Sequence, residues 1–125
     1  MYDLRYLSIA FWGCTGTIPE SIGKMSQLTY LNARDNKFSG PLPASMARLT
    51  LLTYLGMYNA FVSPWEIPSA IHYLTSLQTL DLGTNNICGT LPVLNLTLLQ
   101  SLYLAHNQLT GMIPELGNMI ALQIL

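Results

Sequence analysis

Apolar residues recur along this chain in one fixed frame, L-x-x-L-x-L-x-x-N-x-L-x-G-x-I-P, which is clearest at residues 99–114 (LQSLYLAHNQLTGMIP). The frame returns at 77–92 and 28–43, and more loosely at 4–19 and 52–68. The first leucines of the successive copies, including a partial sixth copy, are Leu4, Leu28, Leu52, Leu77, Leu99 and Leu122. An internal period of 22 to 25 residues indicates a repeat protein in which each copy forms one coil of a solenoid.

Each copy divides into a strand and a return segment. Apolar residues at alternate positions, such as Leu80 and Leu82, predict a short strand with one buried face. Strands that recur in the same direction form a parallel sheet, and the rest of each coil is the crossover between them. The pattern therefore predicts a single solenoid over residues 1–125.

An asparagine closes the strand in three copies. We expect Asn36, Asn85 and Asn107 to turn inward, where backbone groups lose their sheet partners. A side-chain amide both donates and accepts hydrogen bonds, so stacked asparagines can satisfy these groups from coil to coil. The glycine that follows predicts an unusual turn, and the next Ile/Leu-Pro pair predicts an extended segment on the outer side of the coil.

The Gly-x-Ile/Leu-Pro step stands at 16–19, 40–43, 89–92 and 111–114. It resembles the plant-specific subclass of leucine-rich repeats, which fills extracellular domains of plant receptor-like kinases, receptor-like proteins and polygalacturonase inhibitors. Similar repeats occur in surface antigens of some protists. The resemblance implies an α/β repeat solenoid: a right-handed leucine-rich-repeat superhelix with a parallel β-sheet on its concave face and a mostly irregular or 3₁₀ convex side.

Several copies depart from this frame. Repeat one has Trp12 where the asparagine belongs, and in repeat three Asn59 comes one position early. Residues 64–66 (PWE) replace the glycine turn of repeat three, and repeat four is short after Pro92. Since solenoids need polar caps for solubility and no paired-cysteine cap precedes the first repeat, we expect the chain to be a segment of a longer array.

Outward-facing strand positions form columns across the coils, and five of the seven tyrosines are predicted to lie on the concave face. Tyrosine offers a large, rigid contact area and is enriched at binding hot spots, and solenoids bind ligands on their concave side. The same side chains are also cross-strand neighbours that stabilise a sheet by ~0.2–1 kcal/mol per pair. The predicted partner-binding residues are Tyr6, Tyr30, Asn32, Arg34, Tyr54, Tyr58, Asp81, Tyr103 and His106.

Three features of the pattern each have two interpretations. Arg34 and Asp35 either add a polar anchor for a ligand or are ordinary solvated charges, which we favour. Trp12 either anchors a ligand or covers an exposed repeat edge, and covering is favoured. The irregular stretch 61–68, with Trp65, is either a lateral docking feature or loop variation, and loop variation is favoured.

Composition narrows the function classes. Only 9% of the residues are charged, compared with roughly 25% in a typical soluble domain. The net charge is −1 with no basic stripe, which argues against nucleic-acid binding. No apolar run reaches the ~18–20 residues of a membrane span, and Asp3 and Arg5 interrupt the start of the chain, so we expect no signal peptide there.

The cysteines and histidines are not placed for catalysis in this frame. Cys14 and Cys88 lie three coils apart, at about 14 Å, beyond the ~7 Å limit for a disulfide, so we expect free thiols with Cys14 buried and Cys88 in a loop. His72 is predicted on the convex side and His106 on the concave side. No zinc spacing and no phosphate-binding loop is present, so we expect no enzyme activity, no cofactor and no metal site.

The resemblance implies protein or peptide recognition in an extracellular receptor or receptor-like protein of defence or development, with a co-receptor or an enzyme target as further partners. A kinase domain would lie only in other sequence. Two alternatives stay open: a secreted inhibitor of a cell-wall-degrading enzyme, and a structural surface-array or truncated protein with no ligand. Asn95 begins the N-x-S/T sequon of residues 95–97, a candidate glycosylation site that supports secretion only weakly.

Overall fold

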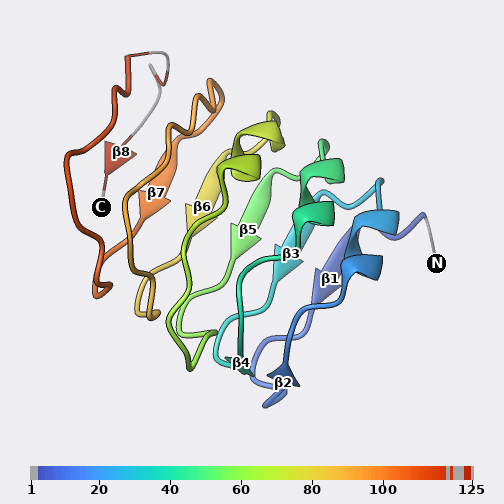
Figure 1. Ribbon diagram of the computed structural model, residues 1–125. Helices are drawn as coiled ribbons and strands as arrows, with labels where there is room; N and C mark the ends of the chain where they lie inside the picture. The colour runs from blue at the N-terminus through green and yellow to red at the C-terminus, as the bar shows by residue number, and fades with distance from the viewer. Residues whose placement is uncertain (1–2, 118, 120–122, 125) are drawn as a thin grey trace.

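The structure is a computed structural model that describes residues 3–117, 119 and 123–124. Six parallel strands form one sheet in chain order, and each strand belongs to one coil (Figure 1). Coils one to six are numbered by these strands, which are β1 (Tyr6–Ser8), β3 (Tyr30–Asn32), β5 (Tyr54–Gly56), β6 (Thr79–Asp81), β7 (Ser101–Tyr103) and β8 (Gln123–Ile124). The fold is the predicted leucine-rich-repeat solenoid with a parallel sheet.

The central leucines of the strands hold the coils in register. Leu31, Leu55, Leu80 and Leu102 face one another across successive strand pairs, and all four are buried. Inward leucines at the start of each copy, such as Leu52 and Leu77, are also fully buried. The alternation of inward leucines and outward polar or aromatic residues therefore places every outward position in a straight column across the sheet.

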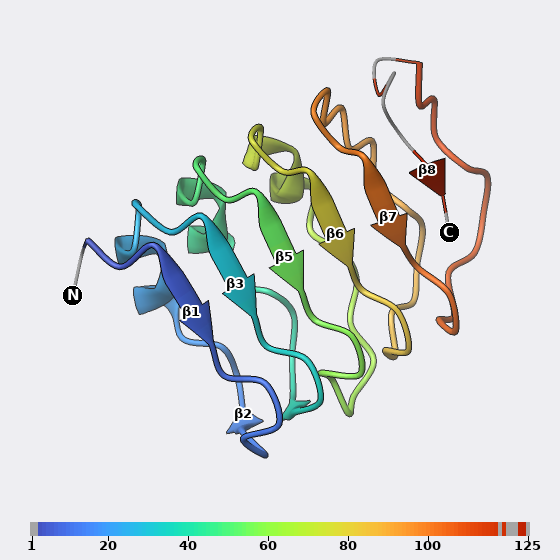
Figure 2. The same cartoon turned by 180° about the vertical axis from the view of Figure 1, so that it is seen from behind.

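A second, narrow parallel strip follows the main strands. It consists of β2 (Thr15–Gly16) paired with β4 (Lys37–Phe38), and lies beyond the ends of β1 and β3 (Figures 1 and 2). Isolated bridges continue it at Phe38–Phe61, Trp65–Ile87 and Thr90–Thr110. The sequence pattern did not predict this strip, because a two-residue strand leaves too short an alternation to recognise.

Three 3₁₀ helices cover the convex side, behind the strands in Figure 2. They are η1 (Glu20–Lys24), η2 (Ala44–Arg48) and η3 (Ser69–Tyr73), and each begins directly after a proline in extended conformation. This order follows from the Ile/Leu-Pro pair, since proline fixes φ and lacks the N–H that the first turn would leave unpaired. In the described part of coils four and five the corresponding segment has no 3₁₀ helix.

Inward-facing asparagine side chains connect neighbouring coils by hydrogen bonds on the interior side of the sheet. Asn85 donates through Nδ2 to the carbonyl of Met57 in coil three (2.7 Å) and to that of Leu82 (3.0 Å). Its Oδ1 accepts from the backbone N–H groups of Ala60 and Phe61, both at 2.9 Å. Buried backbone groups that have no strand partner are satisfied in this way.

Asn36 and Asn107 have the same arrangement in their own coils. Asn36 donates to the carbonyl of Ala33 (2.8 Å) and accepts from the N–H of Cys14 (2.9 Å). Asn107 donates to the carbonyl of Leu82 (2.9 Å) and accepts from the N–H of Ile87 (3.1 Å).

Coil three lacks this asparagine because Ala60 occupies the position and is fully buried. The N–H of Asn36 donates instead to the carbonyl of Asn59, at 3.3 Å. The side chain of Asn59 points the other way and donates through Nδ2 to Oδ1 of Asp35 (2.9 Å). Displacing the asparagine by one residue therefore moves its amide from the interior to the concave edge.

Two sequence predictions differ from the structure in detail. Cys14 and Cys88 are free thiols, but Cys14 is half-buried rather than buried, since it lies in coil one and packs at the rim of the core. The repeat frame places Leu125 opposite Leu102, whereas Leu102 pairs with Ile124, one residue earlier. Leu122 and Leu125 themselves lie outside the described residues.

Candidate ligand-binding surface

Three tyrosines from coils one to three form a stack on the concave face. The register places Tyr6 opposite Tyr30 and Tyr30 opposite Tyr54. Their ring centroids are 4.3 and 4.5 Å apart, with interplanar angles of 4° and 9°. Neighbouring strands lie about 4.8 Å apart, so parallel rings on successive strands stack without displacing the backbone. Both functions considered for these side chains, sheet stabilisation and presentation of a rigid aromatic surface, fit this geometry.

The stack leans along the strands, over the next outward column. A Cβ atom added to Gly56 would lie 2.6 Å from Cε1 and from the hydroxyl oxygen of Tyr54, so the ring lies directly over the glycine. The absence of a side chain at Gly56 thus fixes the tilt of Tyr54. Burial is the main cause of a raised pKa of the Tyr54 hydroxyl, and the negative charges that Tyr30 and Asp81 can carry add to it.

Arg34 forms a second cluster next to the stack. Its guanidinium carbon lies 5.3 Å from the ring centre of Phe11 and 5.5 Å from that of Tyr58. Its Nε donates to Oδ2 of Asp35 at 2.8 Å. Ring faces within about 6 Å attract a cation, so this guanidinium is oriented by two rings and a carboxylate.

The charges of the Arg34 cluster support one another. The hydrogen bond from Asn59 is the largest cause of a lowered pKa of the Asp35 carboxyl group, and the hydrogen bond from Arg34 is the second. The bond to Asp35 raises the pKa of Arg34. Arg34 and Asp35 form an ion pair whose side chains are still 45% and 20% exposed, so the solvated-charge and polar-anchor interpretations both stay open.

The outermost column has an unusual backbone. This column consists of the residue directly before the closing asparagine position in each coil. These residues have φ between 51° and 62°, and they are Phe11, Asp35, Asn59, Thr84 and His106. Asp and Asn adopt this left-handed conformation readily, whereas Phe and Thr do so at some cost. The turn at this point of each coil therefore directs these side chains along the rim of the concave face.

The family model for the leucine-rich repeat matches residues 27–49, 76–96 and 98–119, together more than half of the chain. This chain belongs to the leucine-rich repeat family. The three matched segments cover coils two, four and five, where the frame includes its asparagine. A comparison with curated proteins found no significant match.

Solved structures that are similar to this chain include ectodomains of plant receptor kinases and a plant ice-binding protein. A structure described as the plant peptide hormone receptor RGFR1 in complex with RGF2 matches with a TM-score of 0.92 and 36% identity, over 98% of this leucine-rich repeat chain and 20% of that chain. The ectodomain of the Arabidopsis thaliana receptor kinase GASSHO1/SCHENGEN3, in complex with CASPARIAN STRIP INTEGRITY FACTOR 2, matches with a TM-score of 0.87 and 33% identity, over 98% of this chain and 15% of that chain.

A shorter ectodomain also matches. That of the Arabidopsis thaliana receptor kinase SOBIR1 gives a TM-score of 0.82 and 29% identity, over 94% of this chain and 66% of that chain. The present leucine-rich repeat chain therefore spans a fifth or less of the first two receptor chains named above and about two thirds of the SOBIR1 ectodomain.

The other predicted surface residues occupy coils two to five of the repeat. The side chains of Asn32 and Asp81 each accept a hydrogen bond from the backbone N–H two residues later in the chain. Oδ1 of Asn32 accepts from Arg34 (3.2 Å), and Oδ1 of Asp81 accepts from Gly83 (3.1 Å). Tyr103 is half-buried opposite Asp81, and His106 is exposed on the rim. The structure thus brings Tyr6, Tyr30 and Tyr54 together, and brings Arg34 to Tyr58. Tyr103 lies near enough to Tyr54 to contribute to the raised pKa of the Tyr54 hydroxyl.

The structure places the two tryptophans in opposite environments. Trp12 is 71% exposed, so it does not cover the edge of its repeat, and Phe11 beside it is 70% exposed. Trp65 is only 3% exposed and packs against Phe61 with ring centroids 4.6 Å apart. The ring of Trp65 fills the core where the glycine turn is replaced, which excludes it as an exposed docking side chain.

Sequence analysis missed the contact of Phe11 with Arg34. The available signal was that Phe11 and Arg34 occupy adjacent columns on neighbouring coils, but their spacing alone does not reveal the left-handed backbone that turns Phe11 toward the arginine. The sequence likewise gives no sign that the missing side chain of Gly56 leaves room for the ring of Tyr54.

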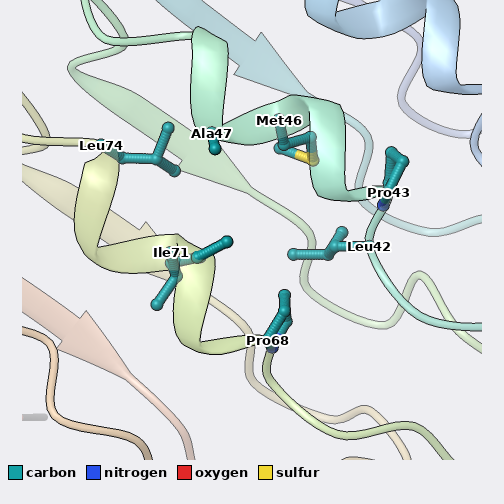
Figure 3. A pocket seen from close by; sticks show the side chains of 8 residues that line it. Leu42, Pro43, Met46, Ala47, Pro68, Ile71 and Leu74 are labelled. Carbon is teal, nitrogen blue, oxygen red and sulfur yellow. The ribbon is translucent and has the colours of Figure 1, made fainter.

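The seam between η2 and η3 on the convex side is closely packed. Figure 3 shows the seam between η2 and η3, where Leu42, Met46, Ile71 and Leu74 converge. The space enclosed there is about 10 Å³, roughly the room for one water molecule. Among the described residues, no group of three or more His, Cys, Asp or Glu side chains is placed to hold a metal ion. No described helix has the length and apolarity to cross a membrane.

Proposed function

We propose that this chain is a recognition segment of an extracellular receptor or receptor-like protein, and that its concave face binds a peptide or protein ligand. The observation that carries the proposal is the stack of Tyr6, Tyr30 and Tyr54 next to the oriented Arg34. A rigid aromatic surface loses little side-chain entropy on binding, and a preorganised guanidinium adds polar specificity. The two clusters lie on coils one to three and face the same side.

The similar structures support this proposal. Two of them are described as receptor ectodomains in complex with named partners, RGF2 and CASPARIAN STRIP INTEGRITY FACTOR 2. Because the chain spans a fifth or less of each, roles in signalling or defence, and an extracellular location, belong to the proposal. Recognition without catalysis is also part of it, since His72 and His106 lie on opposite sides of the coils.

Glycosylation at Asn95 is part of the same proposal. Asn95 and Thr97 are both exposed in coil four, away from the concave face. When the chain is secreted from plant cells, we expect an N-glycosidase to lower its mass, and Thr97→Ala to abolish that difference. An unchanged mass of the secreted wild-type chain would contradict glycosylation.

The proposed function is tested with peptides selected on the wild-type chain from a random library. We expect the double variant Tyr30→Ala, Tyr54→Ala to bind the selected peptides at least about tenfold more weakly, since removal of a hot-spot side chain typically costs more than ~1.4 kcal/mol. Tyr73→Ala is the matched control, because Tyr73 is an exposed tyrosine on the convex η3. Equal affinity of the double variant, with an unchanged circular dichroism spectrum, would contradict binding by the concave face.

A further inference from the structure

The tyrosine stack stops at β6. The column that contains Tyr6, Tyr30 and Tyr54 continues with Thr79 on β6 and Ser101 on β7. The ring of Tyr54 has Tyr30 on one face, and no described aromatic ring stacks on its other face. At the observed spacing of about 4.5 Å, the next ring position lies above Thr79. We call this place, bordered by Tyr54, Thr79 and Asp81, the fourth position.

Coil two shows what the fourth position lacks. Asn32 in coil two and Asp81 in coil four have the same side-chain conformation, with Oδ1 bonded to the N–H two residues on. In coil two, the ring of Tyr30 lies parallel to that of Tyr54 and so leans over the strand position of Asn32. In coil four, Thr79 has no ring to lean over Asp81. The ring that covers this strand position in coil two therefore has no counterpart in the same column of coil four, where Tyr58 instead approaches Asp81 from the next column over Gly83.

The fourth position also has a negative charge. Asp81 replaces the neutral Asn32 of coil two, and no basic side chain among the described residues forms an ion pair with it. Arg34 is the nearby cation, and its Nε is 2.8 Å from Asp35. Tyr103 lies opposite Asp81 on β7, so the carboxylate is flanked by tyrosines from coils three and five.

We propose that the fourth position binds the guanidinium group of an arginine in the ligand. This inference rests on the proposed function and names the side chain that its concave surface recognises. A guanidinium is planar, so it can continue the stack on the free face of Tyr54, and its paired N–H groups fit the carboxylate of Asp81. A lysine ammonium lacks the flat face, and a neutral ring brings no positive charge to the carboxylate.

The direct test uses two small probes on the full 125-residue chain. N-acetyl-L-arginine amide has the guanidinium, and N-acetyl-L-citrulline amide is its neutral counterpart of the same shape. We expect the arginine probe to shift the amide NMR signals of Thr79, Asp81 and Gly83 in a saturable way, and the citrulline probe to leave them unchanged. Equal shifts with both probes, or no saturable shift with arginine, would overturn the proposal.

Variants locate the site. Asp81→Asn keeps the bond to the Gly83 N–H and removes the charge, and Thr79→Tyr fills the fourth position with a ring. We expect each to weaken arginine binding about tenfold, whereas Glu66→Gln, which removes one exposed negative charge outside the sheet, leaves it unchanged. Since Asp81→Asn preserves shape, it keeps the test valid if Thr79→Tyr alters the fold. Unchanged arginine binding in Asp81→Asn would overturn the proposal.

The library-selected peptides separate the two proposals. If Asp81→Asn and Thr79→Tyr bind these peptides as the wild type does, while the Tyr30→Ala, Tyr54→Ala variant does not, the arginine position is wrong and the concave surface stands. If the double-tyrosine variant also binds normally, the proposed function itself fails. We expect the selected peptides to be enriched in arginine, and to lose affinity about tenfold when that arginine is replaced by citrulline.

Discussion

The first three coils and the two that follow them stabilise the same sheet by different means. In coils one to three the outer face is held by stacked rings, and two of the three asparagine positions hold Trp12 and Ala60 instead. In coils four and five both asparagines are present below the sheet, and the outer column is reduced to Thr79 and Ser101. Coil two has both the inner asparagine and a stacked ring, coils one and three have only the ring, and coils four and five have only the asparagine.

This difference has a functional consequence. Coil two has both Asn36 and Tyr30, so the ring stack does not depend on a missing asparagine; it orders the outer surface of coils one to three and produces the rigid aromatic face proposed to bind ligand. In coils four and five the outer column is small, and the fourth position beside Asp81 has no ring stacked on Tyr54. The predictions below test this division of roles, beginning with the interior that both regions share.

The largest effect is expected in the shared core. Leu80→Ala removes a fully buried side chain from the middle of the register, so the free energy of unfolding should fall by ~2–5 kcal/mol. Leu7→Ala, at the equivalent position of coil one, should cost less because Leu7 is only half-buried. Urea unfolding of both variants measures this, and equal losses would contradict a core that is better packed in coil four.

Removal of an inner asparagine should be nearly as severe. Asn85→Ala leaves the N–H groups of Ala60 and Phe61 and the carbonyl of Met57 without their partner. Each unsatisfied buried group costs ~1–3 kcal/mol, so we expect a loss of about 3 kcal/mol in unfolding free energy.

The reverse change, Ala60→Asn, serves as its counterpart. Because the N–H of Asn36 already bonds to the carbonyl of Asn59, an added amide should change stability by less than about 1 kcal/mol. A large stabilisation by Ala60→Asn, or thermal unfolding that is indifferent to Asn85→Ala, would show that the asparagines do not distinguish the two regions.

A smaller loss should follow from breaking the ring stack. Tyr30→Ala removes the middle ring and both contacts, and since an aromatic pair adds ~0.5–1.5 kcal/mol, the total is about 1–3 kcal/mol. Tyr6→Ala removes only one contact and should cost about half as much. Thermal denaturation of the two variants gives the comparison, and equal effects would indicate that the rings do not act as a stack.

The smallest effect concerns acid stability. The pKa of Asp35 is lowered in the folded chain, so its contribution is present above the unfolded pKa of about 3.9 and is lost as pH falls through the lower folded value. Asp35→Asn should therefore lower stability by about 0.2–1 kcal/mol at pH 7 and by little near pH 2. Urea midpoints at the two pH values measure this, and the same loss at both would exclude the charge as its cause.

The sequence predicted the solenoid because its signal is repeated. One L-x-L pair is ambiguous, but the same pair before Asn36, Asn85 and Asn107 determines strand direction, register and outer columns together. The sequence was less informative at residues that depart from the repeat frame in a single copy, because no other copy shows where such a side chain lies. Trp65 was interpreted from a turn motif, although its size and the missing glycine allow it to enter the core. Trp12 was expected to cover an edge, yet its side chain lies in solvent.

The binding surface was predicted as a set of columns but not as clusters. Column membership follows from period-two alternation, which is visible in the sequence. The lean of Tyr54 depends on the absent side chain of Gly56, and the position of Arg34 depends on the positive φ of Phe11. Both are pairwise effects between coils, so no single repeat reveals them.

The claim that the concave face is the recognition surface is tested most directly by mapping a library-selected peptide on the isotope-labelled chain by NMR. We expect the amide signals that change on addition of the peptide to belong to the outer columns of β1, β3, β5, β6 and β7, with the strongest changes around Tyr54. Changes confined instead to η1–η3, or to the strip of β2 and β4, would contradict it.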